Sequence, residues 1–283
     1  MEHNVIDELK QNIKDLTGSE RKVADFIINN TSEVMFDTIN ELSKKVGTST
    51  TTVMRLASKL GYSGYSELQD EIQSFIKLHN DPQTRLTSNL KNIEEDQLWN
   101  QTIAFHMSQL NHFITQINHE AIEGVVDLID KSQKIFCTCV QSGLPVGQYF
   151  SQNINRIKGN CKLINADVSD WIDEIINMTH QDLLFVVSFP RYAKRIRDFA
   201  MIAKEKGVTV VVITDTYSSP LIDYGDIIIP CDSKSLAFHN SPVLAMIAVD
   251  YIINAVAVNE SSKESNRLEE VNEILKRINY HSK

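Results

Sequence analysis

Residues 46–68 read VGTSTTTVMRLASKLGYSGYSEL, and the pattern of this stretch decides how the first part of the chain folds. Five of the six residues from Thr48 to Val53 are Ser or Thr. Because a Ser hydroxyl accepts a hydrogen bond from an amide of the first helical turn, Ser49 is expected to cap a helix. The apolar residues that follow at helical spacing predict the inward face of that helix, namely Val53, Leu56 and Leu60.

Another helix is predicted directly before this one, in DTINELSKKVG, residues 37–47. Its apolar residues Ile39, Leu42 and Val46 share one face, and it ends at Gly47. A helix, a short turn that starts with glycine and a second helix form the helix-turn-helix pattern. The flanking segments up to residue 77 also have helical periodicity, so an all-helical N-terminal domain is expected.

The formal charge of the 283-residue chain, −9, argues against a protein that coats nucleic acid along its whole surface. The charge is unevenly placed, because the residues from Lys44 to Lys59 include four cations and no carboxylate. A local basic excess of this kind is the electrostatic footprint of a small DNA-contacting face.

The second helix of a helix-turn-helix places its N-terminal residues against bases and phosphates in the major groove of DNA. Hydroxyls and cations suit both kinds of contact. We therefore predict that double-stranded DNA is contacted by Lys45, Ser49, Thr50, Thr51, Thr52, Arg55 and Lys59. The alternative is a solvated amphipathic helix in which Ser49 acts only as a cap.

The remainder of the chain has a different sequence pattern, in which near-continuous apolar segments typical of strands alternate with amphipathic segments typical of helices. The strands are predicted in KIFCTCV, CKLIN, DLLFVVSF, GVTVVVITD and GDIIIPC, between residues 134 and 231. This alternation is typical of a mainly parallel sheet covered by helices on both faces. The expected fold class is therefore a helical domain joined to a three-layer α/β/α domain.

Domain boundaries follow from the same patterns. Residues 1–77 are predicted to form the DNA-binding domain, residues 78–95 a polar linker, residues 96–260 the α/β domain, and residues 261–283 a C-terminal helix. This last helix is amphipathic, which suits packing on the α/β domain or on a partner subunit.

Composition excludes several other classes of protein. No apolar run approaches the roughly 20 residues that cross a bilayer, and the N-terminus lacks the apolar core of a secretory signal, so a cytoplasmic protein without membrane contact is expected. The four cysteines form no CxxC pair and lack zinc-finger spacing, and we interpret them as buried free thiols. No metal site and no cofactor are predicted.

The helical segment resembles a known family. The stretches LTGSERKVADFIINN and TINELSKKVGTSTTTVMRLASKLGYSGYSELQDEI are similar to the N-terminal domain of RpiR-type bacterial transcriptional regulators, over about residues 1–77. The matching positions are Ser49, Thr52, Val53, Arg55, Leu56, Leu60, Gly61, Tyr62, Gly64, Tyr65, Glu67 and Leu68. The resemblance implies that the second domain is a SIS (sugar isomerase) domain, which binds phosphosugars.

The resemblance also implies effector-binding residues. Ser142 and Gly143 fall in the loop after the first strand, where such domains contact phosphate, although Cys139 stands where a glycine is common. After the third predicted strand the family usually has a Ser-x-Ser-Gly-x-Thr loop, and this chain reads SFPRYA instead. Ser188 matches the first serine of that motif.

The altered loop exchanges hydrogen-bond donors for positive charge. Pro190, Arg191 and Ala193 occupy the places of the second serine, the glycine and the threonine. Arg191 follows the end of a strand in an α/β crevice and is predicted to bind an anion. His239, in the polar segment AFHNSP, is a further candidate for the same pocket, unless it is simply solvated.

The sequence thus favours a homo-oligomeric transcription regulator, a dimer or a tetramer, that senses a small anionic metabolite such as a phosphosugar. Two alternatives remain open. One is a sugar-phosphate isomerase, for which His180, Asp182 or His239 would be the base. The other is a regulator whose ligand pocket is vestigial and serves only oligomerisation. Because GxSxG, P-loop, HExxH and GxGxxG motifs are all missing from the sequence, we favour a protein that is not an enzyme.

Overall fold

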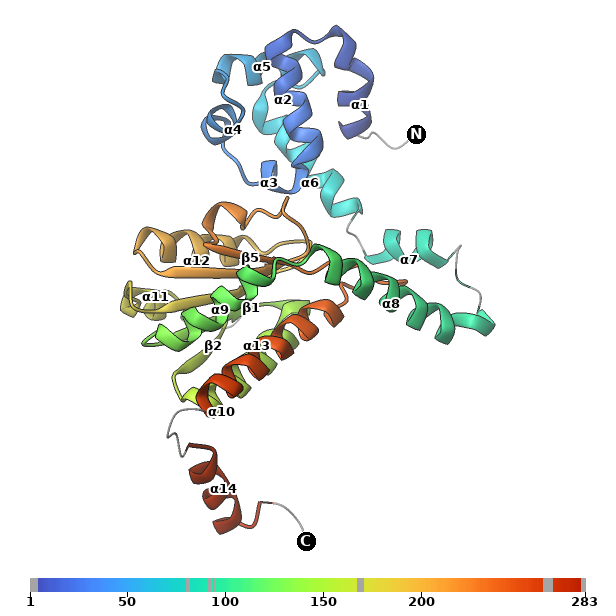
Figure 1. The fold of residues 1–283 in the computed structure, drawn as a ribbon. Helices are drawn as coiled ribbons and strands as arrows, with labels where there is room; N and C mark the ends of the chain where they lie inside the picture. The colour runs from blue at the N-terminus through green and yellow to red at the C-terminus, as the bar shows by residue number, and fades with distance from the viewer. Residues whose placement is uncertain are drawn as a thin grey trace. The chain divides into compact units, whose positions relative to one another are not determined.

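The chain folds into two compact units, which are described separately (Figure 1). One is formed chiefly by the first 93 residues and the other by most of the remaining chain. The computed structural model describes residues 5–79, 82–90, 93, 95–166, 171–261 and 267–280.

The N-terminal unit is helical, as predicted. Its elements are α1 (Val5–Asn12), the 3-10 helix η1 (Ile13–Asp15), α2 (Gly18–Asn29), α3 (Thr31–Val34), α4 (Ile39–Val46), α5 (Thr50–Lys59), α6 (Tyr65–His79) and α7 (Pro82–Leu90). The core is built from the apolar faces of these helices, including Leu9, Val23, Ile27, Leu42, Val53, Leu56, Leu68 and Ile72, all fully buried.

Local signals fix the predicted helix-turn-helix, which comprises α4 and α5. The α4 helix begins with a capping box, in which Thr38 and Glu41 each bond the backbone amide of the other residue. It ends at Gly47, whose φ of +69° is a left-handed conformation that glycine adopts without a Cβ clash. Ser49 caps α5, because its Oγ accepts a hydrogen bond from the Thr52 amide at 3.2 Å. The glycine turn and the Ser49 cap are therefore confirmed.

An ion pair between distant parts of the sequence fixes the end of α5 to α2. Lys59 Nζ lies 2.7 Å from a carboxylate oxygen of the buried Glu20 and also donates to the Asp15 carbonyl oxygen at 3.0 Å. The hydrogen bond from Lys59, followed by that from the Thr17 amide, lowers the pKa of Glu20 from 4.5 to about 2. Lys59 thus stabilises the domain that contains it.

The residues predicted as a linker include a helix. Part of the predicted stretch, residues 80–81, 91–92 and 94, lies outside the described residues. The described part contains α7, which begins at Pro82, a residue that suits the first turn because it has no amide hydrogen to leave unpaired. The 3-10 helix η2 (Glu95–Gln97) follows.

The second unit is an α/β domain with a wholly parallel sheet. Its strands are β1 (Ile135–Cys139), β2 (Cys161–Asn165), β3 (Leu183–Val187), β4 (Thr209–Thr214) and β5 (Ile227–Pro230), in the order β2-β1-β3-β4-β5. Each lies within a predicted apolar segment. Its helices are α8 (Leu98–Gln116), α9 (His119–Lys131), the 3-10 helix η3 (Gln141–Gly143), α10 (Leu144–Lys158), α11 (Trp171–Asn177), α12 (Lys194–Glu205), the 3-10 helix η4 (Ile222–Tyr224), α13 (Val243–Ser261) and α14 (Arg267–Arg277).

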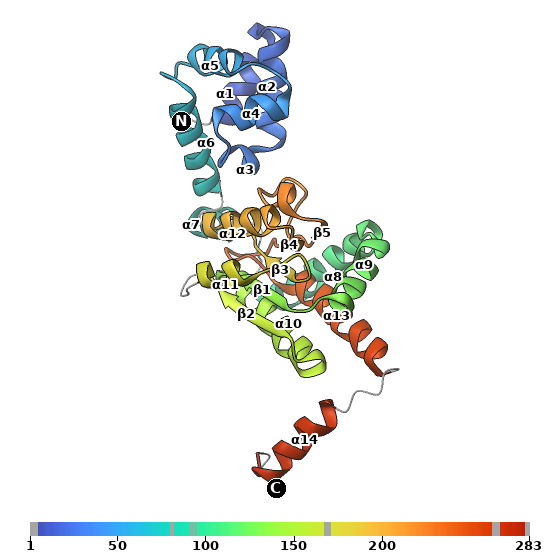
Figure 2. The same ribbon diagram turned by 90° about the vertical axis from the view of Figure 1, so that its left-hand side faces the viewer.

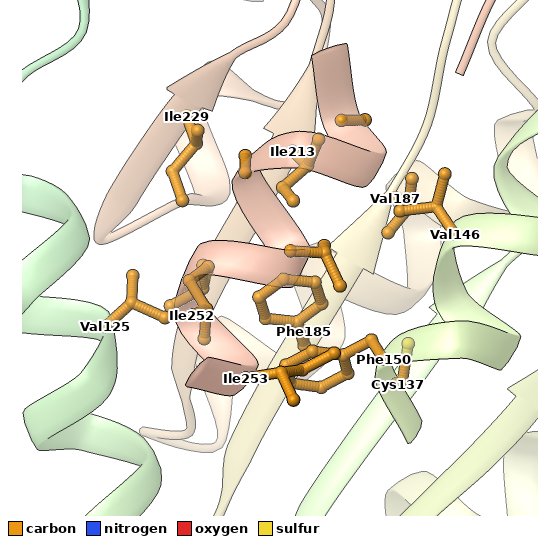
Figure 3. Close-up of a cluster of buried hydrophobic side chains, with 14 of the residues drawn as sticks. Val125, Cys137, Val146, Phe150, Phe185, Val187, Ile213, Ile229, Ile252 and Ile253 are labelled. Carbon is orange, nitrogen blue, oxygen red and sulfur yellow. The ribbon is translucent and has the colours of Figure 1, made fainter. Parts of the chain in front are cut away.

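Helices cover both faces of the sheet, which explains why β1 and β3 are buried at every position (Figures 1 and 2). On one face the strands pack against α9, α10 and α13, and Phe150 of α10 stacks on Phe185 of β3 with ring centroids 3.9 Å apart (Figure 3). On the other face they pack against α11 and α12. The predicted fold class, a helical domain plus a three-layer α/β/α domain, is confirmed.

The α13 helix is long and apolar enough to cross a membrane by length and composition, and it is the single such helix in the described part of the chain. The expectation that no apolar segment is long enough to cross a bilayer therefore does not hold for α13 by length and composition. Its inward side lies in the sheet core and consists of Leu244, Ala245, Ala248, Val249, Ile252, Ile253 and Val256. The helix therefore has a packed place within the α/β unit.

All four cysteines are free and buried, which confirms the interpretation from the sequence. Burial raises the pKa of the Cys161 thiol to about 12 and raises that of Cys137 as well. Cys139, which replaces a glycine common in SIS domains, has its sulfur where a Cβ on Gly147 would lie 2.5 Å away. The missing side chain at Gly147 therefore makes room for the thiol of Cys139.

The Lys59–Glu20 pair makes a pH-dependent contribution to stability. Because the folded pKa of Glu20 is lowered, this contribution is present above pH 4.5 and is lost as the pH falls through about 2. Lys59→Met should lower the free energy that protects the amides of α2 and α5 from hydrogen exchange by about 1–3 kcal/mol at pH 7. The difference from wild type should be smaller at pH 3. Hydrogen–deuterium exchange of the full-length protein at both pH values measures this.

The matched control is Lys22→Met, which makes the same change at an exposed position of α2. This variant should differ from wild type by less than about 0.5 kcal/mol at either pH. Equal protection in the Lys59→Met and wild-type proteins at pH 7 would show that the ion pair contributes nothing.

Candidate functional site

The outward face of α5 is set by the burial of its inward face. Val53, Leu56 and Ala57 are fully buried in the helical core. The helix repeat then directs a different set of side chains to solvent, spaced i, i+3, i+4 and i+7. These are Thr51, Met54, Arg55 and Ser58, all exposed. α5 lies at the edge of the helical unit (Figure 2), in agreement with the exposure of these four side chains.

The predicted hydroxyl contacts divide into two groups. Ser49 and Thr52 bond each other, with their hydroxyl oxygens 3.0 Å apart, and both take part in the cap of α5. Thr51 is exposed and Thr50 is half-buried. All four lie in or next to the first turn of α5, whose amides and dipole favour a nearby anion.

The predicted cations differ in their surroundings. Lys45 is held by two carboxylates, Glu33 and Asp37, the latter at 3.1 Å. Lys59 is held by Glu20. Arg55 is exposed and forms no hydrogen bond or ion pair with any residue in the described ranges. Arg55 is therefore the predicted cation whose charge is available to a ligand without breaking an existing pair.

Asp37 is an unusual buried carboxylate in the helix-turn-helix. It is 2% exposed, and its Oδ2 has no hydrogen-bond partner among the described residues. Burial raises its pKa from 3.8 to about 6, although Lys45 opposes the shift. Its backbone carbonyl oxygen accepts hydrogen bonds from Tyr65 at 2.8 Å and Gln69 at 2.6 Å. These bonds connect the residue before α4 to the start of α6.

Met54 and Ser58 share the exposed face of α5 and were missed by the sequence reasoning. The helical spacing i, i+3, i+4, i+7 from Thr51 would have found both. The arrangement as a whole offers hydroxyls, one unpaired guanidinium and one apolar side chain on a single helix face, which suits contacts to phosphates and base edges in a major groove.

In the α/β unit, strand register gathers the predicted effector residues at one edge of the sheet. Cys139 pairs with Val187, and Val187 pairs with Ile213, so β1, β3 and β4 end at the same level. The loops that follow these strands therefore lie side by side at the carboxyl edge. In open α/β sheets, ligands bind in the crevice at this edge.

The loops after β1 and β3 approach each other closely. A Cβ on Gly143 would lie 2.9 Å from the Val187 carbonyl oxygen, so only glycine fits there. Val187 directly precedes the buried Ser188, and the half-buried Ser142 directly precedes Gly143. The structure thus brings Ser142, Gly143 and Ser188 together.

Arg191 has a left-handed backbone, with φ of +68°. It occupies the place predicted for the glycine of the SIS motif, and its left-handed conformation is one that glycine adopts without strain. Its side chain is exposed. The neighbouring Pro190 carbonyl oxygen accepts a hydrogen bond from Asn240 at 3.0 Å, which brings the segment containing the exposed His239 to this loop.

A cavity of about 550 Å³ lies beside the carboxyl ends of β4 and β5. It is lined mainly by polar side chains of α8 and of the two loops, among them Gln109, His112, Gln116, Asp215, Asp232 and Lys234. None of the five predicted effector residues lines it. The α8 residues could not be identified from the sequence, because polar side chains along one side of an amphipathic helix resemble a solvated face.

Tyr192 connects the two regions. It follows Arg191 in the chain, is buried, and donates a hydrogen bond to Asp215 at 2.6 Å. Asp215 lines the cavity, and burial raises the pKa of its carboxyl group. The altered loop after β3 is therefore directly bonded to the wall of the cavity.

Two of the bases considered for an isomerase lie far from this edge. Asp182 and His180 immediately precede β3, at the amino ends of the strands. Asp182 accepts hydrogen bonds from the amides of Lys134, at 3.0 Å, and Thr179, at 2.8 Å, which is a structural role. Among the described residues, no group of three or more His, Cys, Asp or Glu side chains could bind a metal ion.

Comparisons with known proteins agree with this architecture. The family model described as a helix-turn-helix domain of the rpiR family matches residues 3–77, and the model of the SIS domain matches residues 111–255. A protein of Thermotoga maritima named an uncharacterized HTH-type transcriptional regulator is 23% identical over 276 residues, which cover 95% of this chain and 96% of its own. A protein of Caldanaerobacter subterraneus with the same description is 24% identical, covering 96% and 97%.

Solved structures share the fold. The Vibrio vulnificus NanR protein complexed with ManNAc-6P has a TM-score of 0.64 and 22% identity, and covers 97% of this chain and 99% of its own. The sugar isomerase domain of an RpiR transcription factor from Sphaerobacter thermophilus has a TM-score of 0.60 and 23% identity, covering 62% and 99%. With both domain models matched in order along one chain, this protein belongs to the RpiR family of transcriptional regulators, with an N-terminal helix-turn-helix domain and a C-terminal SIS domain.

Proposed function

We propose that this regulator binds a specific DNA operator through the exposed face of α5 and that a small anionic metabolite, a phosphosugar or a related compound, controls this binding from the SIS domain. The observation that supports the DNA contact best is the unpaired, exposed guanidinium of Arg55 at the centre of that face. Thr50 and Thr51 would contact bases or phosphates, and Ser49 and Thr52 would present the first helical turn.

Lys45 and Lys59 are proposed to contribute less to DNA binding than Arg55. Each ammonium group is already paired with a carboxylate of the same domain. A phosphate that approaches either lysine would share it with Glu33 and Asp37, or with Glu20, and would gain less than from an unpaired cation. Arg55 is therefore proposed as the main cation of the interface.

The DNA contact is tested by Arg55→Ala. A duplex is first selected from a random library with the full-length wild-type protein. The variant should bind this duplex about 10–100-fold more weakly, because one bidentate base contact contributes about 1–3 kcal/mol. Fluorescence anisotropy at several salt concentrations gives the affinity and its salt slope.

Lys10→Ala, which removes an exposed cation from α1, is the control and should bind as wild type does. Operator binding by Arg55→Ala at wild-type affinity would refute the assignment of α5 as the DNA-reading helix.

The effector is proposed to bind at the carboxyl edge of the sheet. Its anionic group would be met by Ser142, the Gly143 backbone, Ser188 and Arg191, and His239 would approach from the loop before α13. The neighbouring cavity, lined by polar side chains, would receive the hydroxyl-bearing part of the ligand. That NanR was solved with ManNAc-6P supports a phosphosugar as the first class to test.

Arg191→Gly separates the charge of this residue from its backbone conformation. Glycine should relieve the left-handed strain, about 1 kcal/mol, so the melting temperature should not fall. The anion contact should be lost, so the concentration of effector that alters DNA binding should rise at least about tenfold. DNA binding titrated with a panel of phosphosugars, including ManNAc-6P, measures the second effect.

Lys194→Ala, at the exposed start of α12, is the matched loss of a cation and should keep the response. An unchanged dose–response curve for Arg191→Gly would move the anion site elsewhere. A panel in which no compound alters wild-type binding would favour a vestigial pocket, and product analysis of the same mixtures would reveal any isomerase activity.

The protein is further proposed to be a homo-oligomer in the cytoplasm, where its DNA target lies. The apolar surface formed by Met107 and Ile114 of α8 and Ile247 and Tyr251 of α13 leaves between 40% and 60% of each residue exposed. Three of these residues line an apolar groove of about 210 Å³. Exposed apolar patches mark association surfaces, and a symmetric dimer or tetramer would present paired helix-turn-helix units to a palindrome.

Sedimentation equilibrium should show a dimer or larger species, and a monomer at micromolar concentration would contradict the proposal.

A further inference from the structure

Met54 is the one large apolar side chain on the exposed face of α5, where Thr51, Arg55 and Ser58 are its neighbours. We propose that Met54 reads thymine methyl groups in the major groove and so determines part of the operator sequence. This inference depends on the proposed DNA-binding function of α5. It assigns sequence discrimination to a residue that is outside the set predicted from the sequence.

Packing within the domain does not account for Met54. The residue is 41% exposed and does not belong to the apolar cluster that forms the helical core. The inward positions on either side of it in the chain, Val53 and Leu56, are fully buried and already connect α5 to that core. Met54 is therefore not needed to hold α5 on the core, and part of the residue remains accessible to a ligand.

The side chain lies over the start of α6. A Cβ on Gly64 would be 3.5 Å from the Met54 methyl carbon, an ordinary van der Waals distance, so the end of the side chain lies beside the loop that precedes α6. Met54 also borders a cavity of about 510 Å³, lined further by Thr38, Ile39 and Tyr65. The flexible thioether thus has room to adjust to a ligand surface.

The chemistry of this surface favours an apolar contact over a phosphate. The backbone amide of Thr38, at the start of α4, is bonded by Glu41 at 2.7 Å, and that of Ser63, before α6, is bonded by Glu67 at 2.6 Å. Glu67 lines the cavity, and its carboxylate would repel a phosphate there. The thymine C5-methyl is the apolar group that the major groove presents, and it separates T·A from the other base pairs.

The position of Met54 suits this contact. It lies between Thr51 and Arg55 on the face that would enter the groove, one turn from the N-terminus of α5. Arg55 would contact a phosphate or a base edge of the DNA beside it, while Met54 would contact methyl groups of neighbouring thymines. Discrimination of this kind would come from apolar burial and would be nearly independent of salt.

The test uses the duplex selected by the full-length protein, with each thymine replaced singly by deoxyuridine, which removes only the methyl group. Wild-type protein should lose about fourfold in affinity at one or two positions per half-site, the factor for burying one methyl group. The same replacements should have no effect on Met54→Gln, a polar variant of similar length. Met54→Leu, which keeps an apolar side chain, should retain sensitivity at the same positions.

Met201→Gln makes the same chemical change in α12 and should keep the wild-type pattern. Uracil sensitivity that persists in Met54→Gln would show that another side chain reads the methyl groups and would overturn the proposal. A wild-type protein insensitive to every replacement would do the same. Failure to select any duplex would instead refute the DNA-binding function itself, and the inference with it.

Discussion

Burial of Val53, Leu56 and Ala57 in the helical core is the contact on which the proposed DNA interface depends. A helix that buries one face must present the opposite face to solvent, so core packing alone orients Arg55 and its neighbours. The cap at Ser49 sets where the helix begins, and the ion pair of Lys59 holds its C-terminal end to α2. The helix backbone of the proposed interface is therefore ordered before DNA binds, so the entropy lost on binding is mainly that of exposed side chains such as Arg55.

Much of the fold could be predicted because its signals are local. The strands β1 and β3 appeared as apolar runs, since the inner strands of a parallel sheet covered on both faces are buried at every position. Helix limits were found where Gly47 and Ser49 give the chain a stop and a start that need no tertiary contact. The helix α3 was missed because four residues are too few for a periodic pattern, and α7 was missed because only Leu86 and Leu90 are large apolar residues in it.

The site was harder to predict because its contacts join distant residues. Nothing in the sequence links Lys59 to Glu20, 39 residues away, so a lysine in a basic stretch looked like a free DNA contact. The pairing of Lys45 could not be predicted for the same reason, since Glu33 and Asp37 reach it only in the folded domain. The polar side chains of α8 that line the cavity form no recognisable sequence motif. Their place beside the sheet edge is visible only in the folded structure.

The loop after β3 places a cation on a backbone conformation that favours glycine. Arg191 has a left-handed backbone, and this strain persists because the surrounding loop is fixed by the bonds of Tyr192 to Asp215 and of Asn240 to Pro190. Backbone amides and hydroxyls that encircle a phosphate are selective for its shape. A guanidinium pairs with phosphate and carboxylate alike. We therefore expect the negative charge of the proposed effector to matter more for binding than the kind of anionic group. For this reason sugar acids should be tested together with phosphosugars.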